Sequence, residues 1–372
     1  MATSPAANSM SDREAQRVAF LEQAGLGAAR RAPLPGDAST RRYERLHLPN
    51  GSTLMLMDQS SALEAPPCGP DWDEARRREA GWNASNRLSA GRVEAFAAVA
   101  HHLKSHGLSA PEIVALDAPA GLAALEDLGQ GVFAELIGSG EADERELYFN
   151  AVDVLARLHA APPPQVLEAP GARWPLLDYD ALALKVAADL FVEWYPKFEP
   201  SLDFGTEAVA EWDALWAPIV ARGAAGASAF AHRDYHAENL LWLPGREGVA
   251  RVGLIDFQDA VRAHPSWDLH SLLQDARRDV SPELEAAALN RYFAARPEVE
   301  REAFLADYAA LATLNEARIL GIFARLIFRD GKPRYRQFMP RMWRHLQANL
   351  AAPGMEGLRA WFDRHVPVEA RA

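Results

Sequence analysis

The sequence predicts an α+β, bilobal fold with a β-rich N-terminal lobe and a mainly helical C-terminal lobe. Two observations support this. Four short strand-like runs lie in the first third of the chain around one prominent helix, and from Asp143 onward apolar residues recur every three or four positions, as in amphipathic helices. We therefore expect a disordered lead-in at residues 1–10, an N-terminal lobe at 11–129 and a C-terminal lobe at 130–372.

The expected elements of the N-terminal lobe follow from its apolar runs and its turn residues. Asn50-Gly51 predicts a hairpin, because both residues tolerate the positive φ of a tight turn. Residues 58–91 are polar and then charged, which indicates a surface excursion with a helix. The helices expected here are Ser11–Ala24 and Val93–His106, and the strands are Tyr43–Leu48, Ser52–Met57, Pro111–Leu116 and Gly121–Leu125.

The C-terminal lobe is expected to be helical apart from one insert. Helices are predicted at Tyr179–Tyr195, from Thr206 to Arg222, and over most of Pro282–Val366. Between them lie two apolar runs, Ala229–Leu243 and Val249–Phe257, which we expect to be short strands.

Composition excludes several classes of protein. The net charge of −12, with no compensating basic stripe, argues against nucleic-acid binding. Cys68 is the single cysteine, so an intrachain disulfide and a multi-cysteine zinc site are both impossible. No apolar run has the length of a membrane helix, and residues 1–8 do not have the pattern of a signal peptide. We expect a cytoplasmic monomer with neither nucleic-acid nor membrane partners.

One constellation of residues carries the chemistry of phosphoryl transfer. That reaction needs a carboxylate to orient the accepting hydroxyl, oxygen ligands for Mg²⁺, and a loop over the phosphates. The segment His232–Asn239 supplies Asp234 and Asn239 five residues apart, and Asp256 ends an apolar run seventeen residues later. If the two short strands pair, all three side chains reach one edge. The alternative is that Asp234 and Asn239 are turn and cap residues and that Asp256 only terminates a strand.

This constellation resembles the H-R-D-x-x-x-x-N loop and the later metal-binding aspartate of the protein-kinase-like fold. Phe257-Gln258 follows Asp256, and only eleven residues separate Asp256 from Asp268. Because no long activation segment fits in that space, a small-molecule kinase is predicted rather than a protein kinase. The arrangement is similar to the aminoglycoside phosphotransferase and choline kinase-like superfamily.

Within that superfamily, the sequence resembles the anomeric N-acetylmuramate/N-acetylglucosamine kinases of peptidoglycan recycling. The resemblance implies ATP- and Mg²⁺-dependent phosphorylation of the C1 hydroxyl of a small-molecule amino sugar. Two alternatives stay open: a kinase of another small hydroxyl compound, such as an aminoglycoside or choline, and a nucleotide-binding pseudokinase. The motifs that carry the resemblance are Pro35–Tyr43, Leu54–Asp58, Leu125–Gly129, His232–His236 and Ile255–Val261.

The resemblance also implies roles for individual residues. Asp234 would be the catalytic base, and Asn239 and Asp256 would hold Mg²⁺. His232 and Asp268 would be structural. The nucleotide would be bound by a turn over the phosphates and by an interlobe hinge at the adenine, which gives the candidates Gly36, Ser39, Thr40, Arg41, Glu126 and Leu128.

The strand lysine that pairs with the phosphates in related kinases is absent from Leu54–Met57, so Arg41 or Arg42 is the expected replacement. The alternative is that the two arginines are an outward-facing charged pair on the hairpin. For Arg233 we consider a structural pair with an acid such as Glu238, or a contact with the lactyl carboxylate of N-acetylmuramate. The acceptor candidates are Glu193, Trp194, Tyr195 and His236, with ordinary core packing as the alternative for the two aromatic residues.

Overall fold

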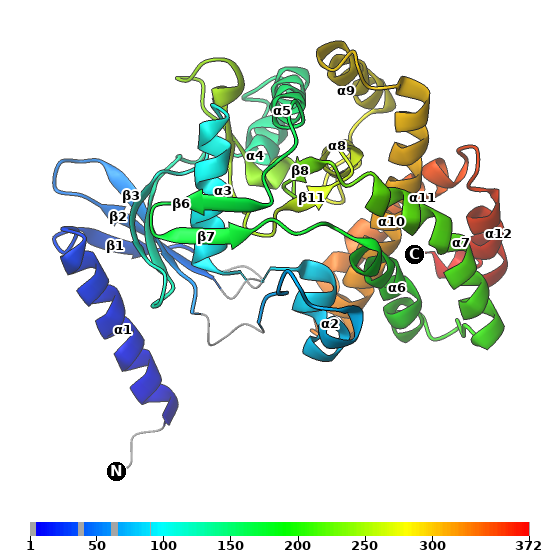
Figure 1. Ribbon diagram of the computed structural model, residues 1–372, viewed down its shortest axis with the longest axis horizontal. Coiled ribbons are helices and arrows are strands. Elements are labelled where there is room, and N and C mark those ends of the chain that lie inside the picture. The colour runs from blue at the N-terminus through cyan, green and yellow to red at the C-terminus, as the bar shows by residue number, and fades with distance from the viewer. Residues whose placement is uncertain (1–4, 36–40, 61–65, 90, 372) are drawn as a thin grey trace.

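The computed structural model describes residues 5–35, 41–60, 66–89 and 91–371, with side chains from Asp12 onward. It confirms the predicted fold class: a five-stranded antiparallel sheet forms one end of the molecule, and helices form the other (Figure 1). No helix in these ranges combines the length and the hydropathy that crossing a membrane requires.

The sheet has the strand order β1-β2-β3-β5-β4. The expected hairpin is confirmed: β2 pairs with β3 from Arg42 opposite Asp58 to His47 opposite Thr53, and Gly51 in the turn has a φ of 87°. The edge strand β1 was not predicted. The strands are β1 (Arg30–Pro33), β2 (Arg42–His47), β3 (Thr53–Asp58), β4 (Ile113–Asp117) and β5 (Leu122–Glu126).

Both faces of the sheet are covered, because neighbouring residues of a strand point to opposite sides. Leu56 packs in a small cluster with Phe20 of helix α1 (Pro5–Gln23), whereas Met57 packs with Phe96 of helix α3 (Val93–Ser105). Helix α1 begins at Pro5 rather than Ser11, so only residues 1–4 of the expected lead-in lie outside the described chain. Its N-terminal end projects from the body of the molecule (Figure 1).

Residues 66–89, which we call the strap, follow the sheet strand β3 in sequence but pack on the helical lobe. The strap holds helix α2 (Glu74–Ala80) and the π-helical turn η2 (Asn83–Arg87). Arg77 Nη2 donates to Asp180 at 3.1 Å, and Asn86 Nδ2 donates to the Ala183 carbonyl at 2.8 Å. These contacts place the strap beside helix α6 (Ala181–Phe198) (Figure 1). The lobe boundary expected at residue 129 therefore does not follow the packing, because the strap precedes this boundary in sequence but packs on the helical lobe.

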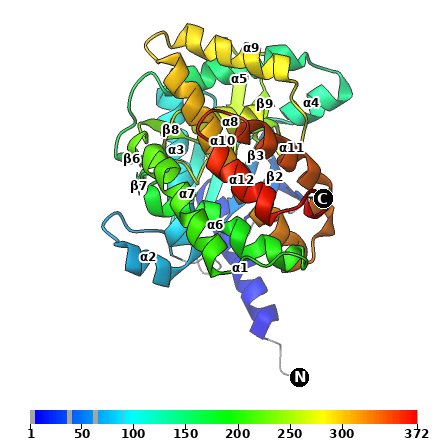
Figure 2. The ribbon, with the colours of Figure 1, turned by 90° about the vertical axis from the view of Figure 1, so that its right-hand side faces the viewer.

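The helical lobe is built around the long helix α10, which packs against α6 (Figure 2). A Cβ on Gly321 of α10 would lie 2.4 Å from the Leu190 backbone of α6, so this close approach requires glycine. The helices are α4 (Phe133–Ser139), α5 (Glu144–Leu158), α6 (Ala181–Phe198), α7 (Thr206–Ala225), α8 (Ser266–Leu273), α9 (Pro282–Ala295), α10 (Arg301–Phe328), α11 (Met339–Leu350) and α12 (Glu356–His365). Helices α4 and α8 were not predicted, nor was the hairpin β6 (Val166–Ala169) with β7 (Ala172–Pro175).

The predicted two-strand insert is a pair of small hairpins. Strand β9 (Leu240–Trp242) pairs with β10 (Val252–Leu254), one from each of the two apolar runs. Strand β8 (Ala229–Ala231) instead pairs with β11 (Val261–Ala263). Leu240 and Leu254 belong to the same buried cluster as Met57 and Leu125 of the sheet, so one core joins both lobes beneath the insert.

Candidate active site

The loop between β8 and β9 is held by a buried carboxylate. Asp268, on α8, accepts the backbone N–H of His232 at 2.6 Å and that of Arg233 at 2.9 Å. Burial raises the pKa of Asp268 to about 7, although both N–H groups favour the charged form. Arg233 has a φ of 75°, a strained conformation for a residue with a side chain, so these bonds help to fix the turn that presents Asp234.

A second set of contacts joins this loop to β10. His232 Nε2 lies 2.9 Å from the Ile255 carbonyl, and the N–H of Ile255 donates to the Asn239 carbonyl at 3.2 Å. Asn239 Nδ2 donates to the Asp234 carbonyl at 2.8 Å. Asp256 follows with a φ of 63°. The structure thus brings Asp234, Asn239 and Asp256 to one end of the β9–β10 hairpin.

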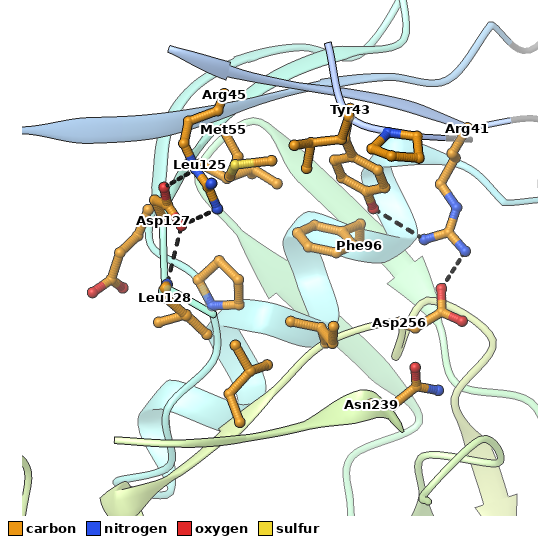
Figure 3. Close-up of a pocket in the computed structure, with 17 residues that line it drawn as sticks. Arg41, Tyr43, Arg45, Met55, Phe96, Leu125, Asp127, Leu128, Asn239 and Asp256 are labelled. Carbon is orange, nitrogen blue, oxygen red and sulfur yellow. Dashed lines mark hydrogen bonds and ion pairs between the residues drawn. The ribbon is translucent and has the colours of Figure 1, made fainter. Parts of the chain in front are cut away.

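A pocket of about 380 Å³, which we call the interlobe pocket, opens between the sheet and this hairpin (Figure 3). Its wall is mainly apolar, and the polar groups lie at its two ends. Asn239 and Asp256 lie together at one end, and the chain that follows β5 forms the other (Figure 3). The lining residues are Leu34, Pro35, Arg41, Tyr43, Arg45, Met55, Phe96, Pro111, Leu125, Glu126, Asp127, Leu128, Gly129, Asn239, Leu241, Ile255 and Asp256.

The segment after β5 offers backbone groups to the interlobe pocket. The backbone of Leu128 has no hydrogen bond to another described residue, which leaves its N–H and C=O available to a ligand. Arg45 Nε donates to Asp127 Oδ2 at 2.7 Å beside it. The side chain of Glu126 is already engaged, because Arg246 Nη2 donates to Glu126 Oε1 at 2.6 Å. The backbone N–H of Glu126 is engaged as well, because it donates to the Glu112 carbonyl at 2.8 Å, so of the two predicted hinge residues Leu128 is the one with a free backbone.

The structure separates the two candidate arginines. Arg41 is buried, forms an ion pair with Asp256 and donates to Gln258 Oε1 at 2.5 Å (Figure 3). Burial alone would raise the pKa of Asp256, but the Arg41 guanidinium holds that pKa below its usual value. Arg42, the first residue of β2, is exposed.

Arg41 also reaches the strand that lacks the lysine. Its Nη1 lies 3.3 Å from the Tyr43 hydroxyl, which in turn lies 3.4 Å from Met57 Sδ on β3. Through Tyr43, the Arg41 guanidinium is thus linked to β3, the strand that lacks the lysine. The predicted phosphate-loop residues Gly36, Ser39 and Thr40 lie outside the described residues.

A second pocket, which we call the polar pocket, is lined by the same loop and has a volume of about 190 Å³. Asp234 and His236 both line it. Burial, together with the nearby positive charge of Arg277, lowers the pKa of His236 to about 4, so this imidazole is neutral near pH 7. The lining residues are Arg233, Asp234, His236, Ser271, Gln274, Asp275, Ala276, Arg277, Asn315, Arg318, Ile319, Ile322 and Phe323.

The structural pair suggested for Arg233 is not formed with Glu238. Arg233 Nη1 donates to the Arg87 carbonyl of the strap at 2.7 Å, and its guanidinium lies over the Tyr179 ring at 4.5 Å. Glu238 lies 3.0 Å from Arg277 instead. Arg233 therefore joins the loop to the strap while also facing the polar pocket.

Three predicted acceptor residues do not line the polar pocket. Tyr195 is fully buried, and its hydroxyl donates to the Ala370 carbonyl at 2.8 Å. Tyr195 therefore packs in the core, which was the alternative to a role in the acceptor site. Trp194 lies under Lys197 Nζ at 4.0 Å, and Glu193 is exposed at the surface of α6. Among the four acceptor candidates, the structure brings only His236 to Asp234.

The sequence reasoning missed the polar residues that α8 and α10 bring to the polar pocket. Asn315 and Arg318 lie on α10, and Gln274 and Asp275 follow α8. A signal for two of them was present, because Asn315 and Arg318, with Glu316 between them, interrupt the apolar residues of a stretch that the sequence predicts to be helical.

Comparisons with known proteins agree with this geometry. The model of the phosphotransferase enzyme family matches residues 30–305. The chain belongs to this family. It is 59% identical over 361 residues to an N-acetylmuramate/N-acetylglucosamine kinase of Caulobacter vibrioides, which covers 97% of this chain and 99% of that protein. A kinase of the same name from Pseudomonas aeruginosa is 30% identical over 86% of this chain and 83% of its own length.

Solved structures share the fold at low sequence identity. A Plasmodium vivax ethanolamine kinase has a TM-score of 0.54 and 11% identity, covering 89% of this chain and 84% of its own. The ADP-bound aminoglycoside phosphotransferase APH(2'')-Ib has a TM-score of 0.51 and 14% identity, covering 89% of this chain and 96% of its own. The fold of the chain is thus that of small-molecule phosphotransferases.

Proposed function

We propose that the protein is an ATP-dependent kinase that phosphorylates the C1 hydroxyl of N-acetylmuramate and N-acetylglucosamine in peptidoglycan recycling. One observation carries the proposal: a single loop lines both pockets, with Asp234 in the polar pocket and Asn239 in the interlobe pocket. A donor in one pocket and an acceptor in the other would meet at this loop. The choice of sugar is supported by the 59% identical kinase of Caulobacter vibrioides.

On the donor side, the interlobe pocket suits a nucleotide. Leu34, Met55 and Leu241 offer apolar surface to a base, and the free backbone of Leu128 can hydrogen-bond its edge. At the other end, Arg41 brings a positive charge that can meet the phosphates, in place of the strand lysine. Arg41 would then exchange its ion pair with Asp256 for contacts with the nucleotide.

The residues present also fit Mg²⁺, which prefers oxygen ligands and takes one or two from the protein in such sites. Asp256 offers a carboxylate in the interlobe pocket, and Asn239 offers an amide oxygen while its Nδ2 is bonded to the Asp234 carbonyl. Bound there, the ion would neutralise the charge of the phosphates. Asp256 and Asn239 would hold it next to Asp234.

On the acceptor side, Asp234 would orient the C1 hydroxyl and accept its proton as the terminal phosphoryl group is transferred. The Asp234 carbonyl accepts Asn239 Nδ2, and Asp268 holds the backbone N–H of the preceding residue, Arg233. Neutral His236 also lines the polar pocket, and its Nε2 lies 3.2 Å from Asn239 Nδ2 and 3.3 Å from Arg277 Nη1, so it would help to position the loop. No charged nucleophile on the enzyme is required, because the hydroxyl itself attacks the phosphorus.

The alternative acceptors are less well matched to the polar pocket. An aminoglycoside or choline is a cation, whereas the polar pocket carries Arg233, Arg277 and Arg318 against two aspartates, Asp234 and Asp275. Such a lining disfavours a positively charged acceptor. The pseudokinase alternative is opposed by the close grouping of Asp234, Asn239 and Asp256.

The test is ³¹P NMR of reactions that contain the protein, ATP, Mg²⁺ and a panel of amino sugars, choline and an aminoglycoside. We expect a sugar 1-phosphate from N-acetylmuramate and N-acetylglucosamine, and none when Mg²⁺ is removed with EDTA. Phosphate at another carbon, or transfer only to choline or the aminoglycoside, would overturn the proposal. GTP in place of ATP tests the choice of nucleotide.

Location and assembly are also predictions. We propose a cytoplasmic monomer, because the reaction consumes ATP and because one chain supplies both pockets. Cell fractionation checks the location, and size-exclusion chromatography with light scattering checks the mass in solution.

A further inference from the structure

Arg318 is an arginine of the polar pocket that has no carboxylate partner among the residues that the structure describes. It lies on α10, and its Nη1 donates to Asn315 Oδ1 at 2.8 Å. Its buried Nε has no hydrogen-bond partner, and among the residues that the structure describes no carboxylate forms an ion pair with it. Burial lowers the pKa of Arg318, as expected for a cation taken out of water without a counter-ion.

The two other arginines of the polar pocket are already engaged. Arg277 pairs with Glu238 at 3.0 Å, and Arg233 donates to a backbone carbonyl of the strap and stacks on Tyr179. Arg233 also places positive charge near Arg318, whereas Asp234 and Asp259 act on Arg318 as negative charges without forming an ion pair with it. Asp259 is itself paired with Arg87 at 2.6 Å.

This imbalance indicates an anionic group in the ligand. A largely buried guanidinium without a counter-ion is unfavourable, and a carboxylate that reaches it restores the balance with charge-assisted, often bidentate hydrogen bonds. The remaining carboxylate of the polar pocket, Asp275, accepts the N–H of Arg277 at 2.8 Å and belongs to the His236 end. Asp275 forms no ion pair with Arg318 among the described residues, so it does not supply the missing counter-ion.

The position of Arg318 is also well fixed. It precedes Gly321 by three residues on α10, where that helix meets the backbone of α6 in a contact that requires glycine. A guanidinium on so rigid an element is preoriented, so little entropy is lost when it binds an anion.

We propose that Arg318 binds a carboxylate of the acceptor and makes the enzyme prefer N-acetylmuramate, which bears a lactyl carboxylate, over N-acetylglucosamine, which does not. This inference rests on the proposed function. Arg318 acts here as a specificity residue, because N-acetylglucosamine would bind in the same pocket without engaging its charge.

The experiment measures kcat/KM of the wild type, Arg318→Gln and Arg318→Lys on three acceptors: N-acetylmuramate, its uncharged methyl ester and N-acetylglucosamine. The matched control is Arg325→Gln, an arginine of the same helix whose buried Nε is also unpartnered but which does not line the polar pocket. Retained activity on N-acetylglucosamine shows that each variant is folded.

For Arg318→Gln we expect kcat/KM on N-acetylmuramate to fall about ten- to a hundredfold relative to N-acetylglucosamine, as for the loss of a charged hydrogen bond. The wild type should lose a similar factor on the methyl ester, and Arg318→Gln should no longer distinguish ester from acid. Arg318→Lys should be intermediate, and Arg325→Gln should resemble the wild type.

Two results would overturn the inference alone: equal losses on both sugars in Arg318→Gln, or a wild type that uses the ester as well as the acid. The comparison of ester and acid on the wild type tests the inference even if the variants do not fold. A wild type that phosphorylates neither sugar would instead refute the proposed function, and the inference with it.

Discussion

The interlobe pocket and the polar pocket share one loop but are built in different ways. The interlobe pocket is lined mainly by apolar side chains, with backbone groups and charges at its ends. The polar pocket is lined mainly by charged and amide side chains that come from the loop, from the end of α8 and from α10. A mainly apolar pocket, such as the interlobe pocket, suits a ligand that many proteins bind. A pocket lined by individual polar side chains, such as the polar pocket, is specific to one acceptor.

The difference indicates how the two pockets tolerate change. A backbone contact such as that offered by Leu128 survives most side-chain substitutions. The polar pocket depends on individual side chains, so single substitutions there should alter the choice of acceptor while leaving nucleotide binding intact. The following predictions test this contrast.

The largest effect is expected for Asp234→Asn, at the junction of the two pockets. Loss of the base should lower kcat by about 10²–10⁴-fold, while the KM for ATP stays within about twofold. Steady-state kinetics measure both quantities, and an unchanged Tm shows that the fold is intact. A variant with wild-type kcat would remove Asp234 from the mechanism.

Next is Arg41→Gln, compared with the matched variant Arg42→Gln. Arg41 is buried against Asp256, so its loss should lower kcat/KM for ATP by about ten- to a hundredfold, the scale of a charged hydrogen bond. Arg42 is exposed, and its variant should stay within about twofold. Equal effects of the two substitutions would show that Arg41 does not replace the strand lysine.

A smaller effect concerns stability in acid. His270 on α8, the helix beneath the polar pocket, is buried, and its burial lowers its pKa to about 3. Because the unfolded histidine binds its proton more readily, the contribution of the neutral, buried His270 to stability is complete above about pH 6.5. That contribution is lost as the pH falls toward 3. Below pH 6.5, the free energy of unfolding should therefore decline by up to about 1.4 kcal/mol per pH unit for this residue.

Urea unfolding at several pH values measures that slope. His270→Gln should reduce the slope, whereas substitution of the exposed His101 with Gln should leave it unchanged. Identical slopes for the wild type and His270→Gln would contradict the prediction.

The smallest effect is expected for Glu193→Gln. Glu193 is exposed and does not line the polar pocket, so kcat/KM on either sugar should stay within about twofold. A clear loss on both sugars would extend the acceptor site along α6 and restore the assignment suggested by the sequence.

The sequence predicted the parts of the site that lie close together in the chain. Asp234 and Asn239 share one loop, Asp256 follows on the paired strand, and local spacing was enough to expect them at one edge. The hairpin at Asn50-Gly51 was predictable for the same reason, since turn chemistry is local.

Long-range packing could not be predicted in this way. Arg318 reaches the polar pocket only because α10 crosses α6 at Gly321, a contact between distant segments. The Glu193–Tyr195 segment has the composition of a sugar site, yet Tyr195 is turned into the core by its bonds to Ala370 and Trp343. Residue type alone cannot tell which face of a buried helix meets a ligand.

The strap has a consequence for how the chain acquires its structure during synthesis. It leaves the ribosome with the sheet, but the groups that it binds, Asp180, Ala183 and Asp259, are made about a hundred or more residues later. At a synthesis rate of about 5–20 residues per second, the strap spends at least several seconds without its partners. The hydrogen bond from Arg233 to the Arg87 carbonyl of the strap can form only after the loop that carries Arg233 has been made. We infer that the strap becomes ordered late and that the sheet folds while the strap is still disordered.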